Sequence, residues 1–265
     1  MGLTLEEINE LRRIRDAARG NSAALPVAVP PAVAVDNDGS RASGSTEMLE
    51  LLIRDIRKFV AEQTELMFNE GDFQLQLAVA LRASGHYDDV QVECYIPNSL
   101  AVEAGYDWDS NLYLDIVVRC GDEYCPVELK YPTRRVVRDI NRFGRELERV
   151  EIMRNQGAQD IVRYNFWKDV RRCEIIKALF PKVNCGLAVM LTNDPSYTRQ
   201  VRASSACLPF STGEGVSAGP GVMDWQGTPT VGKTHTKFHL SSSYRIAWTP
   251  YVIDSEQFYL TIVKI

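Results

Sequence analysis

The sequence LYLDIVVRCGDEYCPVELK, residues 112–130, contains two apolar runs rich in β-branched and aromatic residues, on either side of Gly121-Asp122. Such runs predict β-strands. A glycine at the first position of a two-residue loop is typical of a type II′ hairpin turn. The sequence therefore predicts a tight hairpin in which Cys120 faces Glu123.

Two carboxylates and one amine converge in this hairpin. Continuing the register places Asp115 opposite Glu128, with their Cβ atoms about 5 Å apart, and Lys130 lies two residues further on the same face. Like charges that face each other destabilise a sheet unless they are neutralised, and Mg²⁺ (or Mn²⁺) prefers such oxygen ligands. Lys130 could then orient a metal-bound water or help to deprotonate it, as phosphodiester hydrolysis requires. A surface ladder of ion pairs explains the same residues without a function.

The spacing of these residues resembles a known family. Asp115, followed thirteen residues later by the triplet Glu128-Leu129-Lys130, is similar to the pattern of the PD-(D/E)XK nuclease superfamily, which has the restriction-endonuclease-like fold. Leu114 stands where many members have the proline that gives the family its name. The resemblance covers roughly residues 70–192. It implies a metal-dependent nuclease that holds one or two metal ions on the two carboxylates, with the carbonyl group of Leu129 as a further ligand.

A helix predicted over residues 69–83 supplies a fourth catalytic candidate. Glu70 falls on the same helical stripe as Phe73, Leu77 and Leu81, and an acidic residue on an apolar stripe is unusual. By the resemblance, Glu70 matches the helical glutamate that contacts the metal, whereas the alternative is an ordinary first-turn acid favoured by the helix dipole. The weaker candidates are Glu93 on the neighbouring strand and Gln159, Arg163 and Tyr164 on a later helix.

Five arginines follow the triplet at helical spacing. The segment from Lys130 to Arg172 holds twelve Lys and Arg against six Asp and Glu, which makes +6 within a chain of net charge −5. On a helix expected over residues 135–154, the arginines form a row roughly 140° from an apolar stripe. Such a row is suited to binding backbone phosphates, although a solvated face with ion pairs explains it as well. The row consists of Arg135, Arg138, Arg142, Arg145 and Arg149.

The remaining pattern predicts a mixed α/β fold, restriction-endonuclease-like, with a central mixed sheet flanked by helices and a C-terminal β-rich extension. Further strands are expected at 88–96 and 185–192, further helices near 46–60 and 159–180, and two or three strands within 237–265. The expected organisation is a short helix in 1–20, a flexible Ala/Pro/Gly/Ser linker over 21–45, and a nuclease-like domain over 46–265. Its core spans about 69–192 and its β-rich part 193–265.

Composition excludes several classes of protein. Among 265 residues, 45% are apolar and 25% charged, which is ordinary for a globular chain and unlike a fibrous or wholly disordered one. The sequence has no apolar run of about 18 residues that could span a membrane, and its N-terminus does not resemble a signal peptide. Six cysteines without paired spacing favour reduced thiols. We therefore expect a cytoplasmic protein with no membrane partner, and the N-terminal helix is a candidate for self-association into a homo-oligomer.

Three functions are compatible with these patterns. The first is a Mg²⁺-dependent endonuclease or phosphodiesterase that acts on nucleic acid, with DNA favoured over RNA. The second is a binding or interaction module that has the nuclease fold but performs no chemistry. The weakest is a nucleotide-binding protein, because residues 227–234 match the P-loop pattern. A working P-loop needs a strand before it and an α-helix after it, and here a strand is expected to follow.

Overall fold

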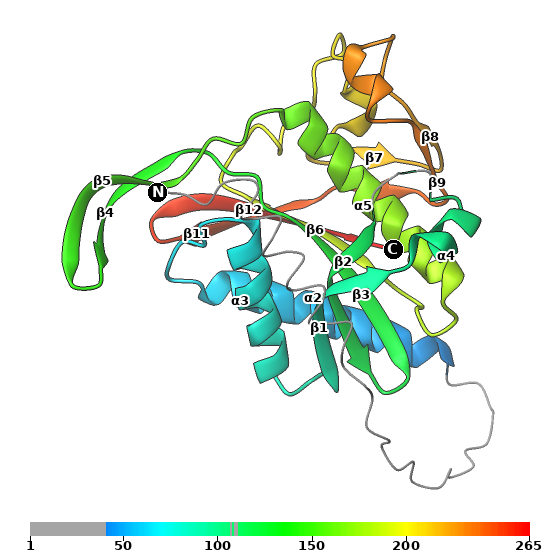
Figure 1. The fold of residues 1–265 in the computed structure, drawn as a ribbon, viewed down its shortest axis with the longest axis horizontal. Coiled ribbons are helices and arrows are strands. Elements are labelled where there is room, and N and C mark those ends of the chain that lie inside the picture. Colours follow the sequence, from blue (N-terminus) through cyan, green and yellow to red (C-terminus); the bar gives the residue numbers. More distant parts are fainter. Residues whose placement is uncertain (1–40, 107, 109–110) are drawn as a thin grey trace, which may run out of the picture. The chain divides into compact units, whose positions relative to one another are not determined.

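A six-stranded mixed sheet forms the centre of the fold (Figure 1). The computed structural model describes residues 41–106, 108 and 111–265, so the helix expected in 1–20 and the linker up to residue 40 lie outside the described residues. The strand order is β1-β2-β3-β6-β12-β11, and all neighbours are antiparallel except β3 and β6. The strands are β1 Asp89–Ile96, β2 Leu112–Cys120, β3 Glu123–Lys130, β6 Leu187–Thr192, β11 Trp248–Ile253 and β12 Glu256–Lys264.

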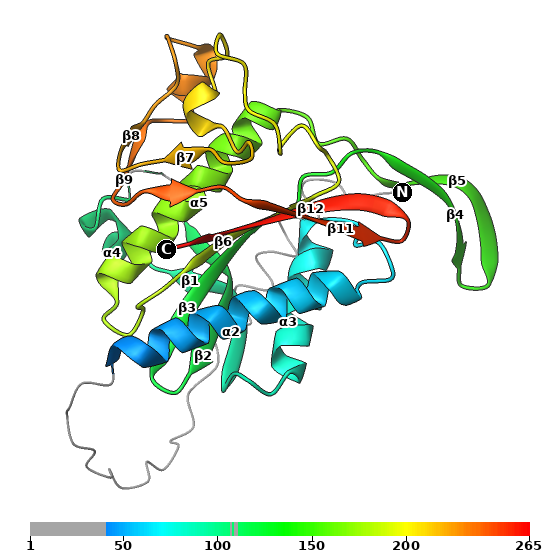
Figure 2. The ribbon, with the colours of Figure 1, turned by 180° about the vertical axis from the view of Figure 1, so that it is seen from behind.

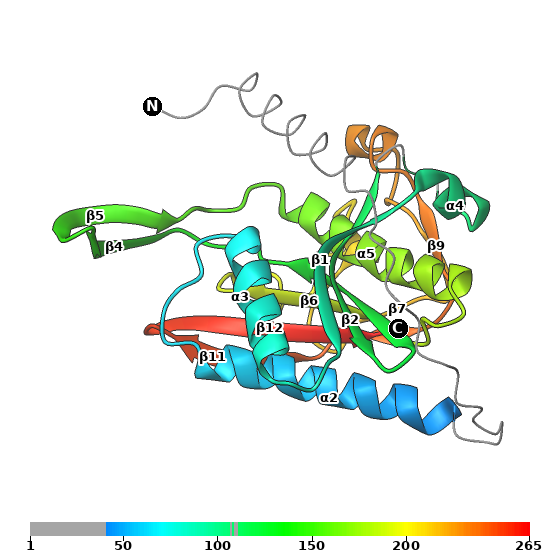
Figure 3. The same ribbon diagram turned by 60° about the horizontal axis from the view of Figure 1, so that its bottom comes forward.

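Helices cover both faces of this sheet. Figures 2 and 3 show α2 and α5 on opposite sides of it. One face packs on α2 and α3 through a buried apolar cluster that includes Leu52, Phe73 and Val127. The other packs on α5 and the C-terminal region through a second cluster that includes Trp167 and Met190. The helices are α2 Arg41–Glu62, α3 Glu70–Ala83, α4 Asn98–Glu103 and α5 Gln159–Leu179. A mixed α/β architecture with a central mixed sheet is therefore confirmed.

Three small two-stranded sheets complete the described residues. They pair β4 (Val136–Arg142) with β5 (Arg145–Met153), β7 (Ser217–Ala218) with β10 (Tyr244–Arg245), and β8 (Gly221–Met223) with β9 (Phe238–Leu240). Two 3-10 turns, η1 (Leu208–Phe210) and η2 (Thr230–Lys233), lie in the same C-terminal region. This region is rich in short strands and turns. The expected division into a core over about 69–192 and a C-terminal extension is wrong in one respect, because β11 and β12 are strands of the central sheet.

The hairpin that joins β2 and β3 has the predicted register. Cys120 pairs with Glu123, and the pairing continues to Ile116 opposite Val127. Gly121 adopts a φ of 58°, the left-handed value that the first position of a type II′ turn needs. The paired positions end at Ile116 and Val127, one step before Asp115 and Glu128.

The helix expected over residues 135–154 is wrong, because this segment forms the β4–β5 hairpin. Phe143 and Gly144 both have left-handed φ values, 54° and 78°, and reverse the chain. Several β-branched residues in the segment favour strands, and the hairpin buries Val136 and Met153 at its base. The spacing of three and four fits a helix, but the tight turn at Phe143-Gly144 and the strand-favouring residues on either side of it prevail. The five arginines therefore do not form a helical row.

The helix expected near residue 46 begins at Arg41, so residues 41–45, assigned to the linker from their Ser and Gly content, are its first residues. These residues contain no proline, and the last proline before them is Pro31. The helix can therefore begin before residue 46, even though several of residues 41–45 are weak helix formers.

The start of α3 is fixed by a side-chain cap. Asn69 has an extended backbone, and its Oδ1 accepts a hydrogen bond from the Asp72 N–H at 2.9 Å. Replacing Asn69 by alanine is expected to lower the free energy of unfolding by about 1 kcal/mol, measured by urea denaturation. Asn69→Ser, which keeps a capping oxygen, is expected to retain most of the stability. Equal stability of all three proteins would contradict this role for the cap.

Candidate active site

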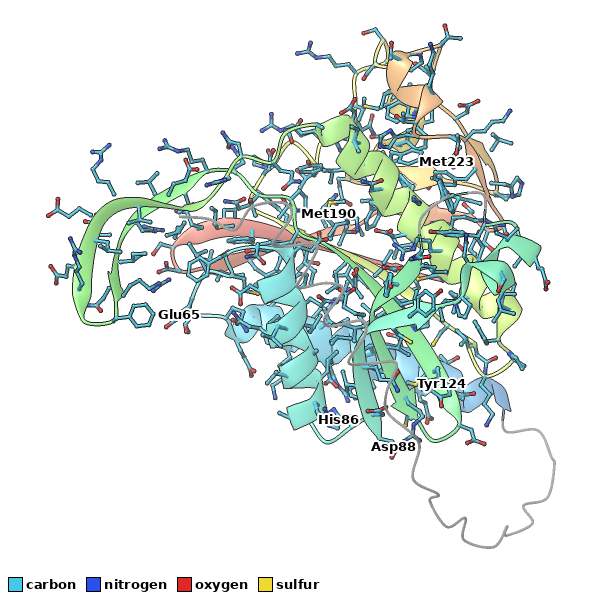
Figure 4. The ribbon with its side chains drawn as sticks, in the orientation of Figure 1. Glu65, His86, Asp88, Tyr124, Met190 and Met223 are labelled. Carbon is cyan, nitrogen blue, oxygen red and sulfur yellow. The ribbon has the colours of Figure 1, made fainter. Side chains whose placement is uncertain are left out.

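Six charged side chains gather where β3 ends, beside the starting turn of α3 and the middle of α5. In Figure 4, Met190 marks this end of the sheet, because Met190 pairs with Lys130, and Tyr124 marks the opposite end of β3. We call this group the charged cluster. It consists of Glu70, Asp115, Glu128, Lys130, Asp169 and Arg172.

Asp115 is held by hydrogen bonds to both its side chain and its main chain. Its Oδ2 accepts from the Leu129 N–H at 2.6 Å, and its carbonyl group accepts from Gln74 Nε2 at 2.7 Å. Desolvation raises the pKa of the Asp115 carboxyl, and the nearby Lys130 ammonium opposes the rise. Gln74, on α3, was not expected from the sequence, and it holds the main chain of β2 at Asp115.

Glu128 is the most deeply buried acid of the cluster, with 1% of its surface exposed. Its Oε1 lies 3.2 Å from Arg172 Nε, but neither carboxylate oxygen makes a well-directed hydrogen bond to any of the residues the structure describes. Desolvation therefore raises the pKa of Glu128 well above its usual range, although the attraction of Arg172 works against it. A buried carboxylate oxygen without a donor is costly, and it indicates a position where a ligand can bind.

Lys130 is firmly protonated. Its Nζ lies 2.6 Å from Asp169 Oδ2 and donates to the Leu129 carbonyl at 2.9 Å. Desolvation alone would lower the pKa of Lys130, but the surrounding carboxylates, Asp169 foremost, outweigh it and raise the pKa. The carbonyl group expected to bind metal is thus occupied by the lysine in this arrangement.

Glu70 lies at the rim of the cluster. The stripe of Phe73, Leu77 and Leu81 is buried as predicted, but Glu70 itself is exposed at the first turn of α3, so its placement on a buried stripe is wrong. Its Oε2 accepts from the Tyr131 N–H at 2.9 Å. Although the residue as a whole is exposed, the protein packed around its carboxyl group raises its pKa by desolvation, and Lys130 opposes this.

Two members of the cluster, Asp169 and Arg172, were missed by the sequence analysis. Asp169 bonds to Lys130 through one oxygen and lies 3.2 Å from Arg172 Nη1 through the other. Arg172 also donates to the Tyr113 carbonyl. Both lie on the side of α5 that buries Val170 and Cys173. Both could have been found from the sequence, because each is a charged residue among apolar ones on one face of a predicted helix. The same pattern singled out Glu70.

A cavity of about 620 Å³ opens beside the cluster. Glu70 and Lys130 line one side of it, and residues near the base of the β4–β5 hairpin, including Glu151 and Arg154, line another. A second, adjoining cavity shares Thr133 and Gln156 with the first. An extended ligand could therefore reach the cluster from solvent.

The weaker candidates lie outside the cluster. Glu93 accepts a hydrogen bond from Gln74 at 3.1 Å, so it is linked to Asp115 only through that amide. Gln159 donates to Asp194 at 2.8 Å. Arg163 is buried and donates to Thr212 and to the Ser196 carbonyl, and Tyr164 is buried and donates to the Thr236 carbonyl. These last three anchor the C-terminal region to α5.

The five arginines have different surroundings on the hairpin. Arg135 lies 2.5 Å from Glu151, and Arg138 binds Glu256 at 2.8 Å and the Asp254 carbonyl. The Arg142 guanidinium lies over the Phe68 ring, 5.2 Å from its centroid. Arg145 and Arg149 form no ion pair with any described residue. Two of the five are therefore neutralised within the protein.

Residues 227–234 lack the surroundings of a P-loop. The lysine and its neighbours form the 3-10 turn η2, and the strand β9 follows. No α-helix begins there to direct backbone N–H groups at a phosphate, as a P-loop requires.

Among the described residues, no three Asp, Glu, His or Cys side chains converge closely enough to form a ready-made metal centre. No helix of that part of the chain is long and apolar enough to cross a membrane. All six cysteines are free thiols and four are buried. Comparison of the chain with protein-family models, with curated proteins and with solved structures gave no match. The geometry of the cluster is therefore the basis for assigning a function.

Proposed function

We propose that this protein is a metal-dependent nuclease with a restriction-endonuclease-like fold, which hydrolyses phosphodiester bonds of DNA. The observation that carries this proposal is the charge of the cluster. Four carboxylates surround two cations, Lys130 and Arg172, which leaves a formal excess of two negative charges when all six groups are ionised. One divalent cation would neutralise this excess.

The donor atoms of the cluster fit Mg²⁺ or Mn²⁺. They are carboxylate oxygens, which these hard cations prefer, and Glu128 has a buried oxygen with no donor among the described residues. Because these carboxylates do not converge closely enough as they stand, Glu70, Asp115 and Glu128 would have to move towards the ion to hold it. The Leu129 carbonyl, which accepts from Lys130 in this arrangement, would be a further ligand. Bound there, the ion would supply a nucleophilic water at neutral pH and offset charge on the phosphate.

The lysine is best suited to an electrostatic role. Because its pKa is raised, Lys130 keeps its proton at neutral pH and is a poor base. Its ammonium group can instead orient water and attract a phosphate oxygen. Arg172 balances Glu128, and Gln74 keeps Asp115 in position. The local positive charge of residues 130–172 and the cavity beside Glu70 support a nucleic-acid substrate.

Metal binding is tested most directly without a substrate. We expect Mg²⁺ or Mn²⁺ to raise the Tm of the protein, because a ligand that binds only the folded state stabilises it by about 2.7 kcal/mol at a hundredfold excess over Kd. Glu128→Gln is expected to lose this shift. Asp122→Asn, an exposed carboxylate at the far end of the same hairpin, serves as the matched control. A shift of the same size in Glu128→Gln would exclude the proposed site.

The second candidate is a nucleic-acid-binding module without catalysis. It is favoured by the internal cations, since Lys130 and Arg172 already engage Asp169 and Glu128. Under this alternative DNA binds equally well with EDTA and with Mg²⁺, and no cleavage follows with either metal. Metal-dependent cleavage would exclude it.

A further inference from the structure

The β4–β5 hairpin is a ribbon that is buried only at its base, and beyond the base it contacts the rest of the described chain mainly through Arg138 on Glu256 and Arg142 on Phe68. We call it the arm. Its two strands pair with each other and with no other described strand, and Figure 1 shows it extending beyond the edge of the central sheet. Val136 and Met153 are buried at the base, whereas the residues towards the tip are exposed or half-buried. An isolated two-stranded ribbon is only marginally stable in water, so a partner that contacts its length would stabilise it.

The tip of the arm exposes a strained aromatic residue. Phe143 has a φ of 54°, a left-handed value that is unfavourable for a bulky residue, and its side chain is 106% exposed. The neighbouring Gly144 is suited to its own φ of 78°. Asparagine would satisfy the same turn at position 143 without exposing an apolar ring. The strained backbone at Phe143 is not offset by any burial of its ring, and strain of this kind indicates that the side chain has a function.

Unpaired positive charge flanks this ring. Arg142 and Arg145 face each other across the hairpin, and like charges in facing positions destabilise a sheet. Neither forms an ion pair within the described part of the chain, and Arg149 also forms none there. The tip therefore combines a solvent-exposed aromatic ring with guanidinium groups that form no ion pair among the described residues.

The arm is next to the charged cluster. Its base lines the cavity that Glu70 and Lys130 also line. Arg142 stacks on Phe68, two residues before Glu70, and in the view of Figure 4 Glu65 lies between the arm and α3. A polymer that contacts the arm can therefore pass directly into the cavity.

We infer that the arm grips double-stranded DNA, with Arg142, Arg145 and Arg149 on backbone phosphates and the Phe143 ring inserted between neighbouring bases. Arginines bind phosphates through charge, and apolar side chains of DNA-bending proteins act as wedges between base steps. This inference rests on the proposed function, because it takes nucleic acid as the substrate, and it specifies a duplex. The arm also carries acidic residues, among them Glu146 and Glu148. Because these would repel a uniformly anionic surface, they favour contacts of the individual arginines with single phosphates.

The test measures binding of the full chain to a duplex in EDTA, so that binding is read separately from cleavage. The duplex carries a fluorescent end label and an internal 2-aminopurine. We expect Phe143→Ala to weaken binding about tenfold, the size of one lost stacking contact, and to abolish the 2-aminopurine signal that reports unstacking. Phe143→Trp, the matched control, is expected to retain both. Phe143→Asn is expected to raise the Tm because it relieves the turn, yet to bind as weakly as Phe143→Ala.

The contribution of the arginines is measured from the salt dependence of duplex affinity. Arg142→Gln with Arg145→Gln is expected to reduce the slope of log affinity against log salt by about 2, while Arg202→Gln, outside the arm, leaves it unchanged. Duplex affinity of Phe143→Ala equal to wild type would overturn the inference while leaving the nuclease proposal standing. Binding of anionic lipid vesicles that depends on Phe143, with no binding to the duplex, would overturn it in favour of a membrane. Loss of cleavage in Glu128→Gln with normal duplex binding tests the proposed function alone.

Discussion

Replacing Glu128 by glutamine is expected to reduce metal-dependent DNA cleavage by about a thousandfold or more, because under the proposed function the change removes a metal ligand and with it several kcal/mol of transition-state stabilisation. The substitution keeps the size of a side chain that is 1% exposed. The measurement is the rate of cleavage of a labelled duplex with Mg²⁺ and with Mn²⁺. Lys130→Met is expected to give a comparable loss, since it removes the ammonium group that lies beside the Leu129 carbonyl and is surrounded by the carboxylates of the cluster.

The control for both variants is an acidic residue at the far end of the same hairpin. Asp122→Asn is expected to cleave as wild type does, because Asp122 lies at the turn of the same hairpin and is fully exposed to solvent. Circular dichroism would establish that each variant is folded. Full activity in both Glu128→Gln and Lys130→Met would remove these residues from any catalytic role.

Replacing Arg172 by alanine is expected to destabilise the protein by about 3–5 kcal/mol at neutral pH. The change leaves Glu128 as a buried charge without a partner, and the loss of one member of a buried pair is costly. The free energy of unfolding from urea titration measures the effect. The double variant Arg172→Met with Glu128→Gln is expected to recover most of the loss, because it removes both charges.

The pH dependence of this variant follows from the raised pKa of Glu128. A carboxyl group with a higher pKa in the folded state binds more protons when folded, so stability falls as pH rises from the usual carboxyl range towards the raised value. Arg172→Ala removes the opposing attraction, and its deficit is therefore expected to shrink on acidification. Lys177→Ala, at an exposed position of the same helix, should show neither effect. A deficit that does not vary with pH would contradict the buried-charge explanation.

Local patterns of sequence predicted most of the elements that form the candidate site. The glycine at position 121 and the cap at Asn69 act within a few residues, and both the hairpin register and the start of α3 are confirmed. The prediction of a helix over residues 135–154 was wrong, because a turn at Phe143-Gly144 interrupts the segment and β-branched residues on both sides of it favour strands. The turn at Phe143 lacks the asparagine that usually marks such a hairpin.

The residues of the site that the sequence did not predict depend on contacts between distant parts of the chain. Asp169 and Arg172 reach the cluster from α5, and Gln74 reaches Asp115 from α3. Their partners are set by how the helices pack on the sheet, which periodicity does not specify. The same packing explains why Lys130 binds Asp169 rather than the two acids of its own hairpin.

The single parallel pairing in the sheet, between β3 and β6, explains why the arm is a separate segment from the strands that carry the charged cluster. Strands that run in the same direction need a long connection, and here residues 131–186 provide it. Helix α5 returns the chain across the sheet, so the arm is an addition that the topology does not need. Surface insertions of this kind vary freely in length. Exchange of this one segment as a module would thus be expected to alter what the protein binds, while the charged cluster, where hydrolysis is proposed to take place, remains untouched.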